Sequence, residues 1–237
     1  MQHNNNSLIY KYYAPTIYNL DALLNRYFWF AKSEYLNDPF DIGNFEKGKR
    51  TLSLHNAILK NSLRDTGFTK KGIKQLIPEY AICSFSRNEL DKQMWAYYAK
   101  DYSGWCLAFK RGVHKQSNIS PIMPVIYVDD LLNPTEIVND SIYGNDPIEI
   151  AMRKLFCTKH ISWKHENEER IVMKTNKKYR GGECPWDTFE LLHITIGHKM
   201  DNAYKSIIQT IANAFNVPVY EISLNNIDFQ LNKQRLE

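Results

Sequence analysis

The segment from Trp163 to Val172 has the clearest chemical content of the chain, because it carries Glu166, Glu168 and Arg170 at alternate positions. At the entry of a strand, side chains two residues apart point to one face, so the two carboxylates are expected side by side. Like charges held close together raise the pKa of one of them, which suits acid–base or electrostatic catalysis. In the competing interpretation Arg170 neutralises a solvated acidic turn, and the residues alone favour neither.

Hydroxyl groups recur with the same spacing in Cys83-Ser84-Phe85-Ser86, at the end of an expected strand. Ser84 and Ser86 should project from one face and Phe85 from the other. Two hydroxyls on one face can orient a polar ligand, but serine also caps many ordinary strand ends.

The opening strand Leu8–Tyr13 places Lys11 on the face opposite Tyr10 and Tyr12. A basic side chain is thereby aimed at one side of the sheet, unless it is simply a solvated edge charge. Trp95 and Tyr98 belong to a dense aromatic segment that is more often packing. Such rings can also stack on a nicotinamide, adenine or nucleobase.

Metal and thiol chemistry find less support. The four cysteines lie more than 20 residues apart, which excludes a C-x-x-C pair and a dense disulfide framework. His160 and His165 lack a second pair at metal-ligand spacing. A metal-dependent nuclease would require distant acidic residues to meet, namely Asp38, Asp41, Glu166 and Glu168. The Asn37-Asp38-Pro39 segment is better explained as a rigid Asx turn, so no metal is expected.

Composition limits the class of protein. The 237 residues are 43% hydrophobic and 24% charged, which suits a full core and excludes disordered, collagen-like and coiled-coil chains. A formal charge of +4 is far below that of a protein that coats DNA. The polar start and the lack of an apolar run of about 18 residues argue against secretion and membrane spanning. We therefore expect a cytoplasmic protein with reduced thiols and no membrane partner.

The elements that must position these residues are mainly strands. Period-two patterns predict them at 8–13, 27–31, 80–85, 104–109, 124–128, 170–174, 189–195 and 217–222. Helical patterns lie at 20–26, 52–65, 69–76, 90–100, 147–160 and 200–215. In the last helix, the stripe that includes Ile207, Ile208 and Ile211 is expected to be buried. Because strands and helices do not alternate regularly, we predict an α+β fold with a mixed, mostly antiparallel sheet and flanking helices, in a single domain over residues 1–237 with its core at roughly 8–230.

The chain resembles a bacterial family catalogued as domain of unknown function 2971, over roughly residues 8–230. The features that carry this resemblance are Tyr10-Lys11-Tyr12, Asn37-Asp38-Pro39-Phe40, Cys83-Ser84-Phe85-Ser86, Met94-Trp95-x-x-Tyr98-Ala99, Gly104 and Trp163-x-x-Glu166-x-Glu168-x-Arg170.

A more distant resemblance is to the ADP-ribosyltransferase superfamily, which uses a basic or histidine residue on an early strand, an S-x-S strand and an E-x-E motif. Lys11, Ser84 with Ser86, and Glu166 with Glu168 stand here in that order. The chain departs from the pattern in having Lys at the first position and longer intervals between the elements. This resemblance implies an ADP-ribosyltransferase-like fold, with NAD as substrate.

The same resemblance implies a role for each residue. Glu168 would stabilise the oxocarbenium-like state formed when the nicotinamide–ribose bond breaks, and Glu166 would orient or deprotonate the acceptor. The NAD-binding residues would be Lys11 for a phosphate or adenosine-ribose oxygen, Ser84 or Ser86 for the nicotinamide ribose, and Tyr12, Trp95 or Tyr98 for a ring wall. Lys11, the serines and Glu168 are expected around one cleft.

These implications predict an NAD-dependent ADP-ribosyltransferase that modifies an unknown intracellular acceptor, either protein or nucleic acid. By analogy its role would be that of a toxin or anti-phage defence effector with a neutralising partner. The alternative is a non-enzymatic nucleic-acid or nucleotide-binding module, suggested by the positive charge, the 15 tyrosines and the basic run from Lys174 to Arg180. Such a run is more often a solvated hairpin tip.

Overall fold

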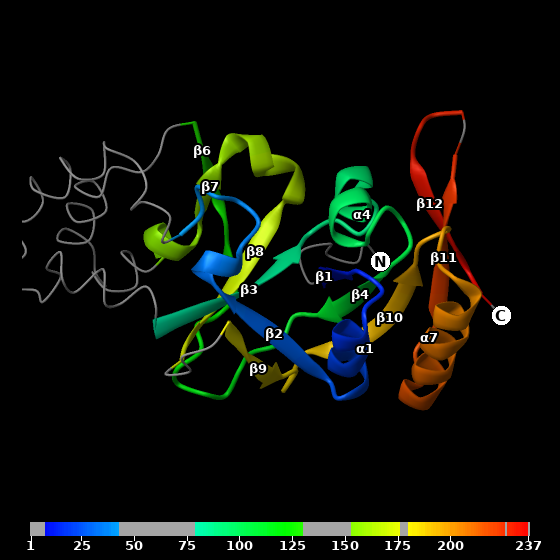
Figure 1. Cartoon of the computed structure of the whole chain (residues 1–237), viewed down its shortest axis with the longest axis horizontal. Helices are drawn as coiled ribbons and strands as arrows, with labels where there is room; N and C mark the ends of the chain where they lie inside the picture. The colour runs from blue at the N-terminus through cyan, green and yellow to red at the C-terminus, as the bar shows by residue number, and fades with distance from the viewer. Residues whose placement is uncertain (1–7, 43–78, 130–152, 176–179, 226, 237) are drawn as a thin grey trace, which may run out of the picture.

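Segments rich in Tyr, Phe, Ile and Val, which favour strands, build one large open sheet in the computed structural model of the protein (Figure 1). The structure describes residues 8–42, 79–129, 153–175, 180–225 and 227–236. The sheet strands are β1 (Leu8–Tyr13), β2 (Tyr27–Lys32), β3 (Tyr80–Ser86), β4 (Trp105–Lys110), β5 (Met123–Pro124), β8 (Glu168–Lys174), β9 (Gly181–Pro185), β10 (Glu190–Ile196), β11 (Val219–Leu224) and β12 (Leu231–Arg235). A separate parallel pair is formed by β6 (Ile126–Val128) and β7 (Thr158–His160).

Strand β3 is the branch point of the sheet. The main path runs β12-β11-β10-β4-β1-β3-β2-β9, and β8 with β5 branches from β3. All of these pairs are antiparallel except β10 with β11. Along its length β3 pairs with β8, so that Ser84 lies opposite Arg170 and Ser86 opposite Glu168. Ser86 also pairs with Tyr10 of β1.

Side-chain alternation gives the sheet two different faces. The apolar face carries the largest core cluster, which includes Ile9, Phe85, Leu107 and Ile171. The polar face carries Ser84, Ser86, Glu168 and Arg170, between two smaller clusters centred on Trp95 and on Ile82 with Val172.

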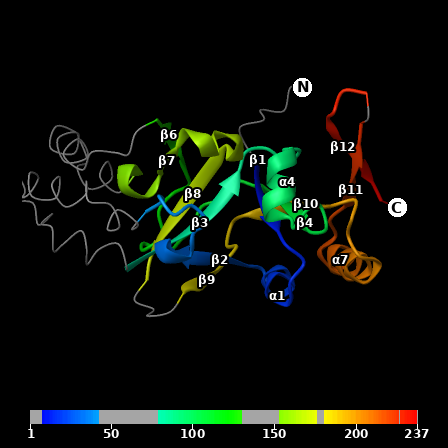
Figure 2. The same ribbon diagram turned by 45° about the horizontal axis from the view of Figure 1, so that its top comes forward.

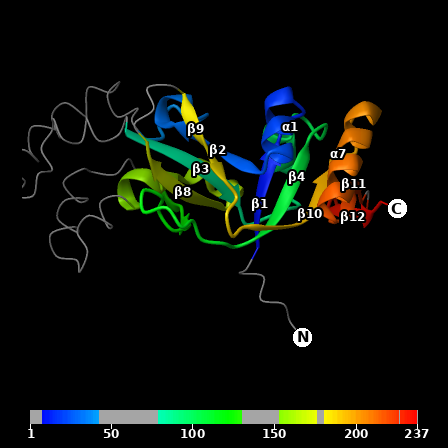
Figure 3. The same cartoon turned by 90° about the horizontal axis from the view of Figure 1, so that it is seen from below.

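The helices cover both faces. Helices α1 (Ile17–Leu24) and α7 (Asn202–Phe215) lie on one side in all three ribbon views (Figures 1, 2 and 3). Leu23 of α1 and the buried residues of α7 belong to the cluster of the apolar face. Helix α4 (Lys92–Tyr98) lies on the opposite side. Each of these helices begins after a residue whose side-chain oxygen accepts from a first-turn N–H, namely Thr16, Asp91 and Asp201. Two 3₁₀ turns, η2 (Ser33–Tyr35) and η5 (Ile161–Glu166), lie in the connections between strands.

The predicted fold class is confirmed as an α+β architecture with a mostly antiparallel open sheet and a few helices. The eight predicted strands are all present with small shifts of their ends, except that 124–128 is divided between β5 and β6. Strands β7, β9 and β12 were not predicted. Strand β7 lies in the segment expected to be helical, β9 contains two glycines and a proline, and β12 is a polar edge strand.

The predicted helix at 147–160 is wrong at its C-terminal end. Residues 153–156 are helical, but the chain then enters strand β7 at Thr158. The predicted helices at 52–65 and 69–76 lie outside the described residues, as does the middle of the basic run from Lys174 to Arg180. Across the parts of the chain that the structure describes, no helix combines the length and the apolar character needed to cross a bilayer.

Helix α7 provides a test of the core. Ile208 is 0% exposed, whereas Ile207 is 43% exposed, so the prediction that Ile207 is buried is wrong while those for Ile208 and Ile211 are confirmed. We expect Ile208→Ala to lower the free energy of unfolding by about 2–5 kcal/mol, because it leaves a cavity beneath the sheet. Urea denaturation measures this, with Ile207→Ala as the matched control. Equal losses in the two variants would contradict the assignment of Ile208 to the core.

Candidate functional site

A chain of buried charges occupies the polar face between its two apolar clusters. It contains Asp41, Lys159, Glu166, Glu168 and Arg170, each at most 5% exposed. The register of β3 with β8 places Glu168 and Arg170 on the same face as Ser86 and Ser84. The remaining three charges come from other segments, so the site exists only when the chain is folded.

Arg170 is at the centre of this charge network. Its guanidinium forms a two-point pair with Asp41, at 2.8 and 2.6 Å, and donates to the Phe156 carbonyl at 2.8 Å. On its other side it contacts Glu168, from Nε at 2.7 Å and from Nη2 at 3.1 Å. Every edge of the guanidinium is therefore used, which is what a fully buried arginine requires.

Lys159 connects Glu168 to Glu166. Its ammonium lies 2.5 Å from Glu166 Oε2 and 3.4 Å from Glu168 Oε2. The ring of Trp163 lies beneath it, with its centroid 4.5 Å from Nζ. Strand β7 brings Lys159 here by pairing with β6, whose Tyr127 hydroxyl accepts from the Glu168 backbone N–H at 2.8 Å.

Glu166 is buried but is connected to the surface by a chain of hydrogen bonds. It ends η5, and Asn167 then takes a left-handed conformation with φ 44° before β8 begins. Ser86 Oγ fixes the turn by donating to the Glu166 carbonyl at 2.8 Å. The carboxyl accepts from the Tyr98 hydroxyl, which in turn accepts from the exposed Asn37 amide at 2.5 Å.

The environments of the two glutamates drive their pKa values apart. Burial and the charge of Glu168 raise the pKa of Glu166 to about 6, against the opposing effect of Lys159. Burial also disfavours the charged form of Glu168, but Arg170 and Lys159 outweigh it and lower the pKa of Glu168 to about 2. At neutral pH Glu168 is thus permanently ionised, while Glu166 can take up and release a proton.

Ser84, Ser86 and Tyr98 all contact this network. Ser86 supports Glu166 as described, and Ser84 hydrogen-bonds the Glu168 carboxylate, which contributes to its low pKa. The half-buried Tyr98 contacts Glu166 directly. The placement of Ser84 and Ser86 on one face, with Phe85 on the other, agrees with the expected alternation.

Lys11 does not join the other members of the predicted cleft. Because Tyr10 pairs with Ser86, Lys11 points to the apolar face, where its ammonium lies 5.2 Å from the centre of the Phe85 ring. Its only approach to the serines is a hydrogen bond to the Ser84 backbone carbonyl at 3.0 Å. The expectation that Lys11, the serines and Glu168 converge is therefore wrong for Lys11.

Tyr12 and Trp95 lie on the polar face but inside the core. Trp95 is 0% exposed, packs edge-on against Tyr12 and donates its indole N–H to the Glu89 carbonyl at 2.8 Å. The Tyr12 hydroxyl donates to the Asn88 carbonyl at 2.7 Å. These contacts leave neither ring a free face for stacking, so of the predicted ring walls only Tyr98 borders the charge network.

The acidic residues weighed as metal ligands are engaged otherwise. Asp38 Oδ1 accepts from the Phe40 backbone N–H at 2.9 Å, which is the expected Asx turn. Asp41, Glu166 and Glu168 do gather, but Arg170 and Lys159 lie between them and offset part of their negative charge. Arg170 pairs with Glu168 as the alternative interpretation of the acidic segment expected, but the pair lies in a buried network and not in a solvated turn.

Three contributors to the network escaped the sequence reasoning: Lys159, the ion-pair role of Asp41, and Asn37. Residues 147–160 read as a helix, which hid the strand that carries Lys159. Asp41 lies 129 residues before Arg170, and no spacing rule connects two such positions. The available signal was an arginine directly before the apolar strand residues 171–173, since a buried guanidinium requires carboxylate partners.

In a comparison with family models, residues 94–171 match a family described as a protein of unknown function (DUF2971). The matched part contains Tyr98, Lys159, Glu166, Glu168 and Arg170, and it supports the resemblance to that family. Neither a curated protein nor a solved structure matched the chain.

The charge network makes a prediction for stability. Arg170→Met should lower the free energy of unfolding by about 3–5 kcal/mol, because it leaves Asp41 and Glu168 buried without their counter-charge. Chemical denaturation measures the loss, and Arg235→Met, at an exposed position of β12, serves as control with an expected change of less than about 0.5 kcal/mol. A loss at Arg170 no larger than that of the control would show that the network does not stabilise the fold.

The raised pKa of Glu166 makes a second prediction. A carboxyl whose folded pKa is about 6 rather than 4.5 contributes stability that is complete below pH 4.5 and is lost as the pH rises through 6. Wild type and Glu166→Gln should therefore diverge in unfolding free energy across this window, with the wild type losing more as the pH rises. Glu190→Gln, at a side chain 63% exposed, should follow the wild type at every pH. Parallel curves for wild type and Glu166→Gln would contradict the shift.

Proposed function

We propose that the protein is an ADP-ribosyltransferase-like enzyme that cleaves the nicotinamide–ribose bond of NAD, with Glu166 as its acid–base group and Glu168 as a fixed negative charge. The observation that carries this proposal is the pair of carboxyls, two residues apart, whose pKa values differ by their surroundings. Pairs of this kind supply one group that titrates near neutral pH and one that stays ionised.

Glycosyl transfer uses both kinds of carboxyl. As the C1′–N bond of NAD breaks, nicotinamide leaves with the bonding electrons and the ribose becomes oxocarbenium-like. A permanently ionised carboxylate favours that positive charge. The acceptor oxygen then bonds to C1′, and its proton passes to the carboxylate of Glu166, which is largely deprotonated at neutral pH. Water as acceptor gives hydrolysis to ADP-ribose, and another hydroxyl gives transfer.

The geometry changes the assignment made from the superfamily pattern. Lys11 is not part of this proposal, because it lies on the apolar face. Glu168 is paired with Arg170 and Lys159, whereas Glu166 also accepts from the half-buried Tyr98, whose hydroxyl accepts from the exposed Asn37. We therefore assign proton transfer to Glu166, with Tyr98 as the neighbouring contact for the ribose or the nicotinamide ring. A protein or nucleic-acid acceptor, and a role as toxin or defence effector, rest on the superfamily likeness.

Nicotinamide release from NAD by the purified protein tests the proposal. Glu166→Gln should lower turnover by about 100-fold or more, because it removes the proton acceptor. Glu168→Gln should also lower turnover while NAD affinity changes little, since the charge acts on the transition state. The matched control Glu190→Gln should keep full activity. The wild-type rate should fall as the pH drops below about 6, where Glu166 takes up its proton.

Two controls make the outcome decisive. Melting temperatures of all variants separate lost chemistry from lost folding. Labelled NAD is incubated with and without a cell lysate, because transfer of label identifies a transferase and nicotinamide release alone identifies a glycohydrolase. If the wild type neither releases nicotinamide nor transfers label, or if Glu166→Gln is fully active, the assignment is wrong.

A further inference from the structure

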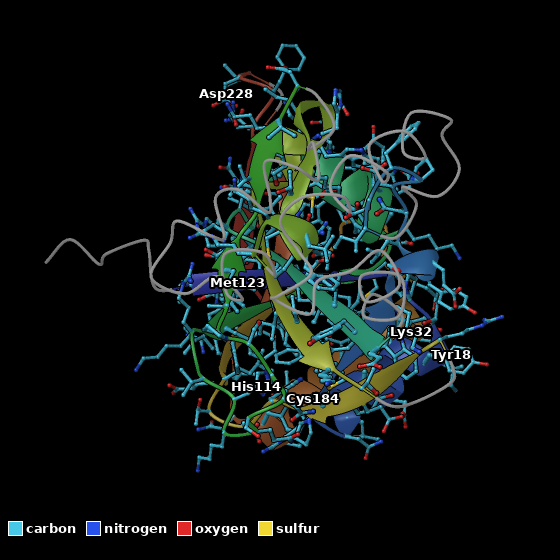
Figure 4. The ribbon with its side chains drawn as sticks, turned by 90° about the vertical axis from the view of Figure 1, so that its left-hand side faces the viewer. Tyr18, Lys32, His114, Met123, Cys184 and Asp228 are labelled. Atoms are coloured by element: carbon cyan, nitrogen blue, oxygen red, sulfur yellow. The ribbon has the colours of Figure 1, made fainter. Side chains whose placement is uncertain are left out.

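We propose that His114, Cys184 and Asp187 form a binding site for a zinc-type divalent cation. Their ligand atoms, one nitrogen, one sulfur and one carboxylate oxygen, all lie within 4.8 Å of one another. They come from the segment after β4, from β9 and from the turn after β9. Figure 4 shows His114 beside Cys184, apart from Met123, which pairs with Arg170 of the charge network. The site is therefore separate from the one proposed for NAD.

The distances within this group fit a tetrahedral cation. Zinc holds sulfur at about 2.3 Å and nitrogen or oxygen at about 2.0 Å, so its ligands lie about 3.5 Å apart for sulfur with nitrogen and about 3.3 Å apart for nitrogen with oxygen. Here His114 Nδ1 lies 3.6 Å from Cys184 Sγ and 3.0 Å from Asp187 Oδ2. Two of the three separations are thus close to those that one cation requires, and the sulfur and the carboxylate oxygen lie within 4.8 Å of each other.

The sharing of one ring nitrogen argues against a catalytic triad. In a triad the base contacts the nucleophile with one nitrogen and the orienting carboxylate with the other. In this group the thiol and the carboxylate both face Nδ1, while Nε2 is buried and has no hydrogen-bond partner among the described residues. A single nitrogen cannot bond well to both groups, but a cation between the three atoms satisfies all of them.

The backbone holds the two segments together at this point. Thr188 Oγ1 accepts from the Val113 N–H and donates to the Val113 carbonyl, both at 2.6 Å, which clamps the neighbours of His114 and Asp187. A side chain on Gly112 would place its Cβ 2.6 Å from the Phe189 nitrogen, so glycine permits this approach. The site is therefore preorganised before a cation binds.

The surroundings favour a borderline metal with solvent access on one side. The imidazole is 1% exposed and lies against the rings of Phe28, Phe30 and Phe189, whereas the Asp187 carboxylate is 23% exposed. A thiolate and an imidazole select zinc over magnesium or calcium. Water completes the tetrahedron on the side of Asp187. On binding, the Cys184 thiol releases its proton to solvent and gives up its contact with the Pro185 carbonyl.

Metal titration of the full chain tests this proposal. After treatment with a chelator, the protein should bind about one equivalent of Co²⁺ with a thiolate-to-cobalt charge-transfer band, and Zn²⁺ should displace it. Zn²⁺ but not Mg²⁺ should raise the melting temperature. Cys184→Ser and Asp187→Asn should weaken Zn²⁺ binding by more than about 100-fold, since even the loss of a group that supports a ligand costs 10- to 100-fold.

Cys106→Ala removes another buried thiol and should leave Zn²⁺ binding unchanged. Asp187→Asn changes a partly exposed side chain, so it keeps the test valid if Cys184→Ser does not fold. A wild-type protein that binds no Co²⁺ with a charge-transfer band, or an Asp187→Asn variant that binds Zn²⁺ as tightly as the wild type, would overturn the proposal. NAD cleavage is not a readout here, so failure of this site and failure of the proposed enzyme are distinguishable.

Discussion

The buried guanidinium of Arg170 sets the constraint on which the polar face depends. It is 1% exposed, and its charge is paired with the carboxylates of Asp41 and Glu168. Desolvation of such a charge is costly, and two carboxylates with good geometry offset it. Three parts of the chain must therefore meet at this guanidinium: the segment that holds Asp41, the strand β8 and the carbonyl of Phe156. Their meeting fixes these parts relative to one another.

That constraint propagates along the network. Burial raises the pKa of Glu166, and because Arg170 keeps Glu168 ionised, the negative charge beside Glu166 raises it further. Lys159 limits this rise by bridging the two carboxylates. The same arrangement therefore supplies both stability and a titrating group, and a change at Arg170 would alter both. A second buried carboxylate on this face, that of Glu89, has partners of a different kind.

Glu89 is surrounded by His193, Lys233 and Thr195, with contacts of 2.8, 2.6 and 2.5 Å. Burial alone would raise its pKa, but these partners lower it to about 2. No other carboxylate contacts it among the described residues, so no like charge beside it raises its pKa. A buried carboxylate is thus not in itself a candidate acid–base group, and the coupling of Glu166 to Glu168 is what distinguishes the two sites.

Local spacing predicted what a single strand determines. The strands themselves, the shared face of Ser84 and Ser86, and the proximity of Glu168 to Arg170 all follow from the alternation of side chains. The partners that come from elsewhere did not follow, because Asp41 and Lys159 meet the network only through tertiary packing. The burial of Trp95 could not be predicted for the same reason, because a helical pattern does not show which neighbouring elements cover a side chain.

Lys11 shows how strand pairing decides such questions. Alternation correctly placed it opposite Tyr10 and Tyr12, but not on the face of the serines. Which residues of other strands share a face with Lys11 depends on the register of pairing. Tyr10 lies opposite Ser86, so Lys11 shares a face with Phe85. A shift of one residue would have turned Lys11 toward Glu168. The His114, Cys184 and Asp187 group depends on pairing in the same way, because β9 must lie beside β2 for Cys184 to face the aromatic core that holds His114. Chemistry that spans strands is therefore fixed by register, and the motif spacing within each strand supplies only its candidates.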